Sequence, residues 1–257
     1  MPLYRPSELT AFLRSLDIRP KRSMSQNFLI DGNIVQKIVE SVPEGANVVE
    51  IGPGPGVLTE SLLAHGFEIL AIEKDDTLAA ALPRLDETGH RLKVVHQDVL
   101  EYSLSEKSTI VANLPYSLTT PIFKWIIKQH VFVSRAIVMV QHEVAERLLH
   151  PPTSYLQVLL SCAFDLYYLC RVSKKCFLPV PKVDSAVLVL LHKQKAVKIP
   201  QEVLAYVFSQ KRKTLLSSLS KFYPKEKIEE RFDRLGLSNK LRPEQLSPDL
   251  LLELLML

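Results

Sequence analysis

Short apolar runs alternate with stretches of helical periodicity between about residue 30 and residue 190. The apolar runs predict seven strands, at residues 48–51, 68–73, 92–96, 109–112, 135–141, 162–169 and 185–192. Amphipathic stretches such as residues 58–65, 77–85 and 118–128 separate the first five of them. This alternation is typical of a parallel, doubly wound α/β sheet. No clear helix joins the last two runs, so we expect an antiparallel pair to finish the sheet.

The pattern changes after His192, where only helical periodicity remains. Helices are predicted at residues 201–210, 213–222, 225–235, 243–246 and 248–257, with Pro, Gly and Ser at the joints. We therefore expect two domains, an α/β domain over residues 1–192 and a small all-helical domain over residues 193–257. Seven strands with an antiparallel end match a Rossmann-like methyltransferase sheet better than a six-stranded dinucleotide-binding sheet.

Composition narrows the class of protein. The chain has 257 residues and 47% hydrophobic content, without an apolar run near the roughly 20 residues that a membrane span requires. The three cysteines lack C-x-x-C spacing, so we expect no metal site. The N-terminus lacks the apolar core of a signal peptide, so we expect a cytoplasmic protein without membrane contact.

The net charge of +4 is unevenly distributed. Residues 193–257 hold 13 lysines and arginines against 8 acids, and a second basic cluster lies at Arg19-Pro20-Lys21-Arg22. A solvated helical surface and contact with a phosphate backbone both explain such clusters.

Asn113-Leu114-Pro115-Tyr116 stands between a predicted strand and a predicted helix. Such a turn can place an amide oxygen, a proline carbonyl and an aromatic ring around one flat substrate that carries an amino group. The exocyclic amine of a nucleobase fits these partners. A helix-capping Asn followed by a core Tyr is the alternative interpretation.

Three glycines, Gly52, Gly54 and Gly56, follow the first strand with G-x-G-x-G spacing. The dinucleotide fingerprint requires a further glycine where Val57 stands, so a smaller anion near the helix N-terminus is favoured. Glu73 ends the second strand, where an acid can accept from ribose hydroxyls. Asp98 ends the third, where it can accept from the adenine amine. These residues share the carboxyl edge of the sheet, and S-adenosyl-L-methionine fits them.

With these motifs in view, the sequence resembles the KsgA family of small-subunit (16S) rRNA adenine N6-dimethyltransferases over nearly its whole length. The resemblance is carried by Gln26-Asn27-Phe28-Leu29, the glycine loop, Ala71-Ile72-Glu73, Gln97-Asp98, Asn113-Leu114-Pro115-Tyr116, Gln141 with Glu143-Val144-Ala145-Glu146-Arg147-Leu148, Phe177-Leu178-Pro179-Val180-Pro181-Lys182-Val183-Asp184-Ser185, and Lys211-Arg212-Lys213-Thr214-Leu215. Ser25, His142 and Leu156 depart from the family pattern.

The resemblance implies roles for individual residues. The catalytic residues would be Asn113, Leu114, Pro115, Tyr116 and Phe177, with the rings of Tyr116 and Phe177 clamping the target adenine. S-adenosyl-L-methionine would be bound by Gln26, Asn27, Leu29, Gly52, Gly54, Gly56, Glu73, Lys74, Asp98, Val99 and Asn113. Small-subunit rRNA would be bound by Lys21, Arg22, Arg147, Lys211, Arg212 and Lys213. From the residues alone, Phe177 could equally be a core side chain before a proline-rich loop.

The predicted function is therefore N6-dimethylation of two adjacent adenines in the 3′-terminal hairpin of small-subunit rRNA during ribosome biogenesis, by a monomer. Three alternatives stay open. They are a large-subunit rRNA adenine methyltransferase, a protein glutamine methyltransferase, and a noncatalytic RNA-binding assembly or transcription factor of the same fold. Leu114 and the basic C-terminal region argue against the second, and Glu73 and Asp98 against the third.

Overall fold

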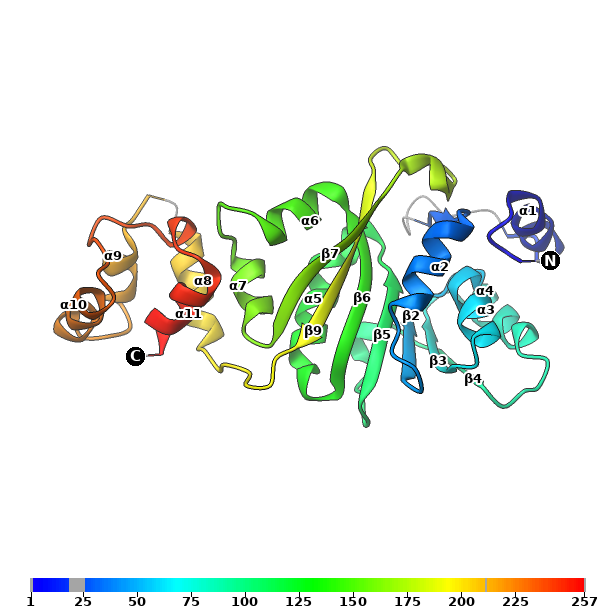
Figure 1. Ribbon diagram of the computed structural model, residues 1–257, viewed down its shortest axis with the longest axis horizontal. Helices are drawn as coiled ribbons and strands as arrows, with labels where there is room; N and C mark the ends of the chain where they lie inside the picture. The colour runs from blue at the N-terminus through cyan, green and yellow to red at the C-terminus, as the bar shows by residue number, and fades with distance from the viewer. Residues whose placement is uncertain (1, 19–25, 211, 257) are drawn as a thin grey trace. The chain divides into compact units, whose positions relative to one another are not determined.

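A seven-stranded sheet forms the centre of the computed structural model, which describes residues 2–18, 26–210 and 212–256 (Figure 1). The strand order is β4-β3-β2-β5-β6-β9-β7. The strands are β2 (Asn47–Ile51), β3 (Glu68–Glu73), β4 (Leu92–His96), β5 (Ser108–Asn113), β6 (Val133–Gln141), β7 (Phe164–Val172) and β9 (Ser185–His192). The seven predicted strands are all confirmed, with ends that differ by a few residues.

Pairing within the sheet is parallel from β4 to β6, and β9 runs antiparallel to β6. The last two predicted strands thus finish the sheet as neighbours, β9 beside β6 and β7 at the edge. The order of the strands reverses between β2 and β5. From β2 the chain adds β3 and β4 on one side, and it then returns to add β5 and β6 on the other side. Open α/β sheets bind ligands at this point, beyond the carboxyl ends of the strands.

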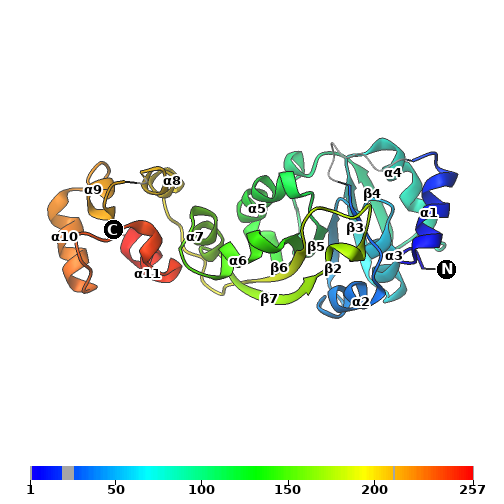
Figure 2. The same ribbon diagram turned by 90° about the horizontal axis from the view of Figure 1, so that it is seen from above.

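Burial explains why the central strands read as continuous apolar runs in the sequence. Residues 108–112 of β5 are all buried, and so are residues 48–51 of β2. Helices cover both faces of a parallel sheet, so both faces of these strands are mostly apolar. Figure 2 shows α2 (Gly32–Glu40) and α5 (Thr119–Lys128) on opposite faces.

Further helices of the sheet region precede or follow its strands. They are α1 (Pro6–Ser15), α3 (Val57–Ala64), α4 (Asp76–Ala81) and α6 (His142–Leu149), with 3-10 turns at Leu82–Leu85, Val99–Glu101, Tyr116–Leu118, His130–Phe132 and Lys174–Cys176. The helices α2 and α4 have aspartate N-caps. Asp31 accepts from the backbone nitrogens of Asn33 and Ile34 before α2, and Asp75 caps α4. The helices therefore start at fixed positions beside the strand ends.

A two-stranded sheet not predicted from the sequence joins two distant segments. β1 (Phe28–Leu29) pairs antiparallel with β8 (Phe177–Leu178). The Ile30 nitrogen also donates to the Cys176 carbonyl at 2.8 Å. This pairing fixes residues 26–29, which precede α2, against the segment between β7 and β9.

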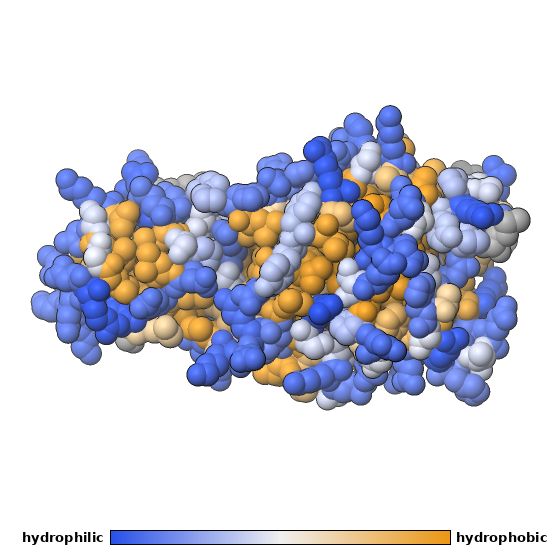
Figure 3. Space-filling view, in the orientation of Figure 1, coloured by the Kyte–Doolittle hydropathy of each residue, from blue (hydrophilic) through white to orange (hydrophobic). Residues whose placement is uncertain are grey.

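Near the β7 edge, one face of the sheet is partly uncovered. On the face shown in Figure 3, hydrophobic residues gather over β6, β7 and β9 between hydrophilic ones. β7 is an edge strand, and its Tyr167 and Tyr168 are 52% and 41% exposed.

The chain divides into two compact units, residues 1–145 with 167–191, and residues 146–166 with 192–257. The second unit contains α7 (Tyr155–Ser161), α8 (Gln201–Ser209), α9 (Leu215–Leu219), α10 (Lys225–Arg234), α11 (Pro248–Leu255) and a 3-10 turn at Pro243–Gln245. The predicted domain boundary at 192/193 therefore differs from this division, because residues 146–166 group with the C-terminal helices. Thr153 shows why: its hydroxyl donates to the Leu246 carbonyl at 2.6 Å, and its nitrogen to that of Glu244 at 3.0 Å.

None of the helices in the described residues is both long and apolar enough to cross a membrane. Within the same residues, His, Cys, Asp and Glu form no group of three or more that could hold a metal ion.

Candidate active site

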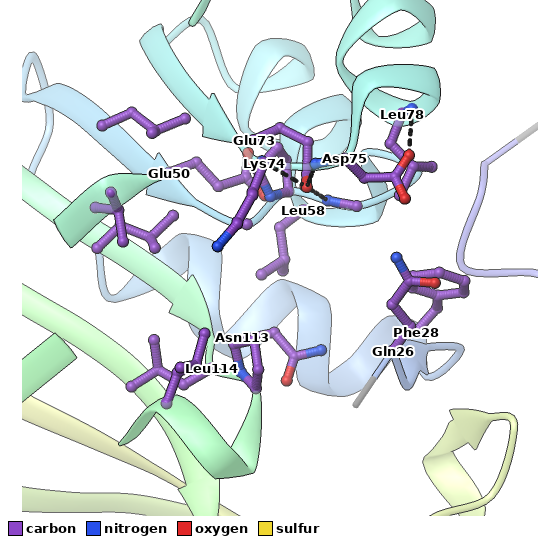
Figure 4. Close-up of a pocket in the computed structure, with 18 of the residues that line it drawn as sticks. Gln26, Phe28, Glu50, Leu58, Glu73, Lys74, Asp75, Leu78, Asn113 and Leu114 are labelled. Atoms are coloured by element: carbon purple, nitrogen blue, oxygen red, sulfur yellow. Dashed lines mark hydrogen bonds between the residues drawn. The ribbon is translucent and has the colours of Figure 1, made fainter. Parts of the chain in front are cut away.

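A cavity of about 290 Å³ lies at the carboxyl ends of β2, β3 and β5. In Figure 4, the acids Glu50, Glu73 and Asp75 lie on one side of it and Asn113 lies across from them, while Gln26 and Phe28 close a third side. Of the residues predicted to bind cofactor or act in catalysis, those that line the cavity are Gln26, Asn27, Leu29, Gly52, Gly54, Glu73, Lys74, Asp98, Val99, Asn113, Leu114, Pro115 and Tyr116. One pocket thus brings together residues from five predicted motifs.

The glycine loop makes room at the floor of this pocket. Gly54 has a φ of +60°, and a Cβ there would lie 3.1 Å from the Phe28 ring. Gly56 does not line the pocket. Its φ is +92°, and a Cβ would lie 2.2 Å from Leu85 Cδ1, so it permits close packing at the start of α3.

Glu73 is held by three backbone donors. One oxygen accepts from the Gly54 nitrogen at 2.9 Å, and the other from the nitrogens of Lys74 and Asp75 at 2.8 Å each. Burial raises the pKa of Glu73, and the three donors oppose that rise. A carboxylate offers about four lone-pair sites, so roughly one is left for a ribose hydroxyl. The loop and the acid are thereby locked in one geometry.

Glu50 was not predicted as a site residue, although it lines the pocket and is only 1% exposed. Its Oε2 accepts from the Thr59 hydroxyl at 2.7 Å. Burial raises the pKa of Glu50 to about 8, against the opposing hydrogen bond from Thr59. The available sequence signal was an acid inside an apolar strand, in the run Val48-Val49-Glu50-Ile51.

Asp98 and Lys74 form an ion pair at the pocket wall, with Lys74 Nζ 2.8 Å from Asp98 Oδ2. The other carboxylate oxygen accepts from the Leu100 nitrogen at 3.0 Å. Burial would raise the pKa of Asp98, but the hydrogen bonds from Lys74 and Leu100 outweigh it, so the pKa lies below its ordinary value. The carboxylate therefore stays ionised and can accept from an amino group.

Asn113, at the end of β5, is oriented by the N-terminal segment. Its amide nitrogen donates to the Asn27 carbonyl at 3.0 Å. Because the two ends of an amide point apart, the Asn113 oxygen is directed away from that carbonyl. An acceptor with a fixed direction is what binding of an exocyclic amine requires.

The two residues that follow Leu114 are anchored as well. The Pro115 carbonyl accepts from the Leu118 nitrogen at 2.8 Å, so a substrate amine could use only its second lone pair. The Tyr116 hydroxyl shares a hydrogen bond of 2.8 Å with Ser185 Oγ, and burial raises the pKa of Tyr116. The ring is thus fixed at the pocket wall by its distal end.

The structure does not bring Phe177 into the pocket. Its side chain is 1% exposed and belongs to the hydrophobic core, since Phe177 pairs with Leu29 in the two-stranded sheet. In this arrangement its ring cannot stack on a base, and such stacking stays a prediction that would require the ring to leave the core.

Of the residues predicted to bind RNA, those that the structure describes do not line the pocket. Lys21, Arg22 and Lys211 fall outside the described residues. Arg147, Arg212 and Lys213 are exposed and belong to the second compact unit.

The positions that depart from the family pattern have ordinary structural roles where they are described. The His142 nitrogen donates to the Asp184 carbonyl at 3.0 Å, and Leu156 is buried in α7. Ser25 lies outside the described residues.

S-adenosyl-L-methionine fits the donor and acceptor groups of the pocket. Asp98 offers an acceptor for the adenine amine, Glu73 one for the ribose, and Gly54 leaves the floor open. Apart from these groups the wall is largely apolar, with Ile51, Leu78, Val99 and Ile122 among its residues. Such a lining suits the apolar faces of a nucleoside.

Known proteins support the same conclusion. The family model described as ribosomal RNA adenine dimethylase matches residues 18–256. A ribosomal RNA small subunit methyltransferase A of Protochlamydia amoebophila (strain UWE25) is 40% identical over 267 aligned positions, which cover 96% of this chain and 94% of that protein. The protein of the same name from Chlamydia trachomatis serovar L2 is 38% identical and covers 92% of this chain and 91% of its own length.

Solved structures agree on the fold. The crystal structure of the 23S rRNA methyltransferase ErmE has a TM-score of 0.75 and 26% identity, and covers 90% of this chain and 98% of its own. That of a dimethyladenosine transferase from Plasmodium falciparum has the same TM-score at 24% identity, and covers 89% and 96%. The predicted Rossmann-like methyltransferase fold is confirmed. The chain, by its match to the family model and its identity to these relatives, belongs to the ribosomal RNA adenine dimethylase family.

Proposed function

We propose that this protein uses S-adenosyl-L-methionine to dimethylate the N6 atoms of two adjacent adenines in the 3′-terminal hairpin of small-subunit rRNA. The proposal rests on one observation above the others: Asn113, Pro115 and Tyr116 share one pocket with Glu73 and Asp98. A base-holding turn and a nucleoside-binding wall thus face the same cavity.

The cofactor supplies an electrophilic methyl group on sulfur. Asp98 would accept from its adenine amine and Glu73 would accept from its ribose, while the glycine loop leaves space for its methionine end. Residues 26–29 lie over the same pocket and would limit the access of water.

Asn113 holds the target amine. The N6 lone pair of adenine is delocalised into the ring, so the free amine is a poor nucleophile. A hydrogen bond from N6–H to the Asn113 amide oxygen would favour a pyramidal nitrogen and aim its lone pair at the methyl group. Positioning of this kind can carry much of a methyl transfer, because the reacting atoms are held at near-contact distance.

A general base is not needed for the first step, because the methylated nitrogen becomes acidic before it loses its proton. Monomethyladenine keeps one N–H, so it can return to the same acceptor for a second transfer. Tyr116 would stack on the base and contribute about 1–3 kcal/mol to its binding. The base must leave its stack to reach the pocket, which favours a hairpin loop as the target.

The small-subunit target is favoured over the large-subunit one by the relatives of 38–40% identity, which are named small subunit methyltransferases. The 23S rRNA methyltransferase is less similar, at 26% identity. We further propose that the protein acts in the cytoplasm as a monomer, with the exposed Arg147, Arg212 and Lys213 among its contacts to rRNA.

Methyl transfer to small subunits that lack the modification is the direct test. The expected result is two dimethylated adenines in the 3′-terminal hairpin, mapped by mass spectrometry of the rRNA. Large subunits serve as the comparison substrate. Methylation of large-subunit rRNA alone, or no transfer despite cofactor binding, would overturn the proposal.

A further inference from the structure

A second basic surface, distinct from the residues already proposed to bind rRNA, lies between β7 and β9. Residues 167–191 contain four basic side chains, Arg171, Lys174, Lys175 and Lys182, and one acid, Asp184. All four basic residues are exposed. This part of the chain therefore carries a local excess of positive charge.

The single acid does not neutralise this surface. Asp184 accepts from Arg171 Nη2 at 2.8 Å and Nε at 3.1 Å, and from the Lys174 nitrogen at 3.0 Å. Among the described residues, neither Lys175 nor Lys182 takes part in an ion pair. Asp184 thus holds Arg171, while the lysine ammonium groups stay available.

Both ends of the segment are attached to the wall of the pocket. Leu178 pairs with Phe28, which lines the pocket, and Ser185 bonds to the hydroxyl of Tyr116, which also lines it. The loop between them, residues 179–184, is named here the rim loop. In Figure 1 it is the turn at the upper end of β9. Lys182 is therefore held between two residues that contact the pocket wall, and Lys174 and Lys175 lie a few residues before the first of them, Leu178.

The rim loop also exposes apolar side chains. Val180 and Val183 are 59% and 44% exposed on either side of the exposed Lys182, while Pro181 between them is buried. Cations bind phosphates, and exposed apolar groups beside them can contact sugars or base edges. A free phosphate would use only the lysines, whereas a nucleic-acid strand would use both kinds of group.

We propose that Lys174, Lys175 and the rim loop bind the RNA strand that flanks the target adenine. The lysines bind its phosphates, and Val180 and Val183 contact the neighbouring nucleotides. This inference rests on the proposed function, since it assumes that an adenine in an RNA strand enters the pocket.

The lysines are tested with the triple variant Lys174→Gln/Lys175→Gln/Lys182→Gln in the full chain. Lys107→Gln is the control. The exposed Lys107 precedes β5, so it lies at the amino ends of the parallel strands, and the pocket lies at their carboxyl ends. Each phosphate contact to a single strand contributes about 0.7 to the slope of log affinity against log salt. Affinity of the triple variant for the 3′-terminal RNA hairpin should fall roughly 10- to 50-fold at 0.15 M salt, with a slope smaller by about 2. Cofactor affinity should stay within about twofold.

A second variant, Val180→Ser/Val183→Ser, separates the two kinds of contact. It should weaken hairpin binding without changing the salt slope, because apolar contacts release no counterions. Equal hairpin binding by the triple variant, Lys107→Gln and the wild type would overturn the inference.

Hairpin binding is measured directly, so it is independent of methyl transfer. If the wild type binds cofactor but methylates no RNA, the proposed function fails, and the binding data alone then decide the role of the rim loop.

Discussion

The side-chain amide of Asn113 donates to the backbone carbonyl of Asn27 at 3.0 Å, across 86 positions of sequence. The contact joins the end of β5 to residues 26–29. One end of the amide is thereby used for structure, and the other is left to face the pocket. The N-terminal segment is thus part of the proposed catalytic geometry.

Asn113→Ala should abolish methyl transfer while the fold persists. We expect turnover to fall by at least about 100-fold, since the oriented acceptor is lost, in line with the catalytic weight of positioning. Stability should fall by about 1–3 kcal/mol, because the Asn27 carbonyl loses its donor. Single-turnover methylation and urea unfolding measure the two effects. Asn33→Ala, at an exposed position of α2, is the control; retained turnover in Asn113→Ala would refute the assigned role.

Tyr116→Phe and Tyr116→Ala should separate the hydroxyl from the ring. Phe keeps the stacking surface but leaves the buried Ser185 hydroxyl without its partner, so we expect a loss of about 1–3 kcal/mol in stability and nearly unchanged turnover. Ala removes the ring and should lower kcat/KM for RNA by roughly 5- to 150-fold. Ser185→Ala should resemble Tyr116→Phe. Equal kcat/KM in the Phe and Ala variants would count against stacking.

Lys74→Met should make cofactor binding more sensitive to acid. The hydrogen bond from Lys74 lowers the pKa of Asp98, whereas burial raises it. Without Lys74 the pKa of Asp98 should rise, so the carboxylate takes up a proton at a higher pH. The ratio of variant to wild-type Kd for S-adenosyl-L-methionine should therefore be larger at pH 5 than at pH 8. Equilibrium binding across this range is the measurement. Lys93→Met, at an exposed position of β4, should leave the ratio constant.

Glu50→Gln should change how stability depends on pH. The pKa of Glu50 is raised to about 8 in the folded chain, from 4.5. As pH rises between these values, the unfolded chain releases the proton first, so the wild type loses up to about 1.4 kcal/mol per pH unit from this group. Gln cannot ionise, so the variant should gain stability relative to the wild type from pH 5 to pH 8. Urea unfolding at both pH values tests this; a constant difference would contradict it.

Gly56→Ala should be more destabilising than Gly45→Ala. Both glycines have positive φ, but a Cβ at Gly45 meets no atom within 4 Å, while one at Gly56 would lie 2.2 Å from Leu85. Gly45→Ala should cost about 1–2 kcal/mol from backbone strain alone. Gly56→Ala should cost about 1–3 kcal/mol more, from overpacking at the start of α3. Equal urea midpoints for the two variants would show that the contact with Leu85 relaxes freely.

Most of the sheet was predictable because its central strands are buried on both faces and read as apolar runs, as in β5. The pairing of β1 with β8 was not, since two residues carry no periodicity. Whether Phe177 is a core residue or a base-stacking residue depends on that pairing, which places Phe177 opposite Leu29 in the core. The position of residues 146–166 was likewise missed, because it depends on hydrogen bonds from Thr153 to residues near position 245.

Within the site, the strand-end residues Glu73, Asp98 and Asn113 were predictable from topology, since parallel strands end at one edge. Their partners were not. The donors to Glu73 come from the backbone, and the link from Lys74 to Asp98 depends on a flexible side chain. Sequence patterns report which elements meet, and they carry little information on which lone pairs are already used.

The pairing of β1 with β8 also sets an order of events during synthesis. Phe28 is made 150 residues before its partner Leu178. Until then, the segment that closes the pocket has nothing to pair with, and Asn113 has no fixed neighbour on that side. A nascent chain thus completes its cofactor pocket only after Leu178 has been made, when all strands of the parallel part of the sheet have already been synthesised.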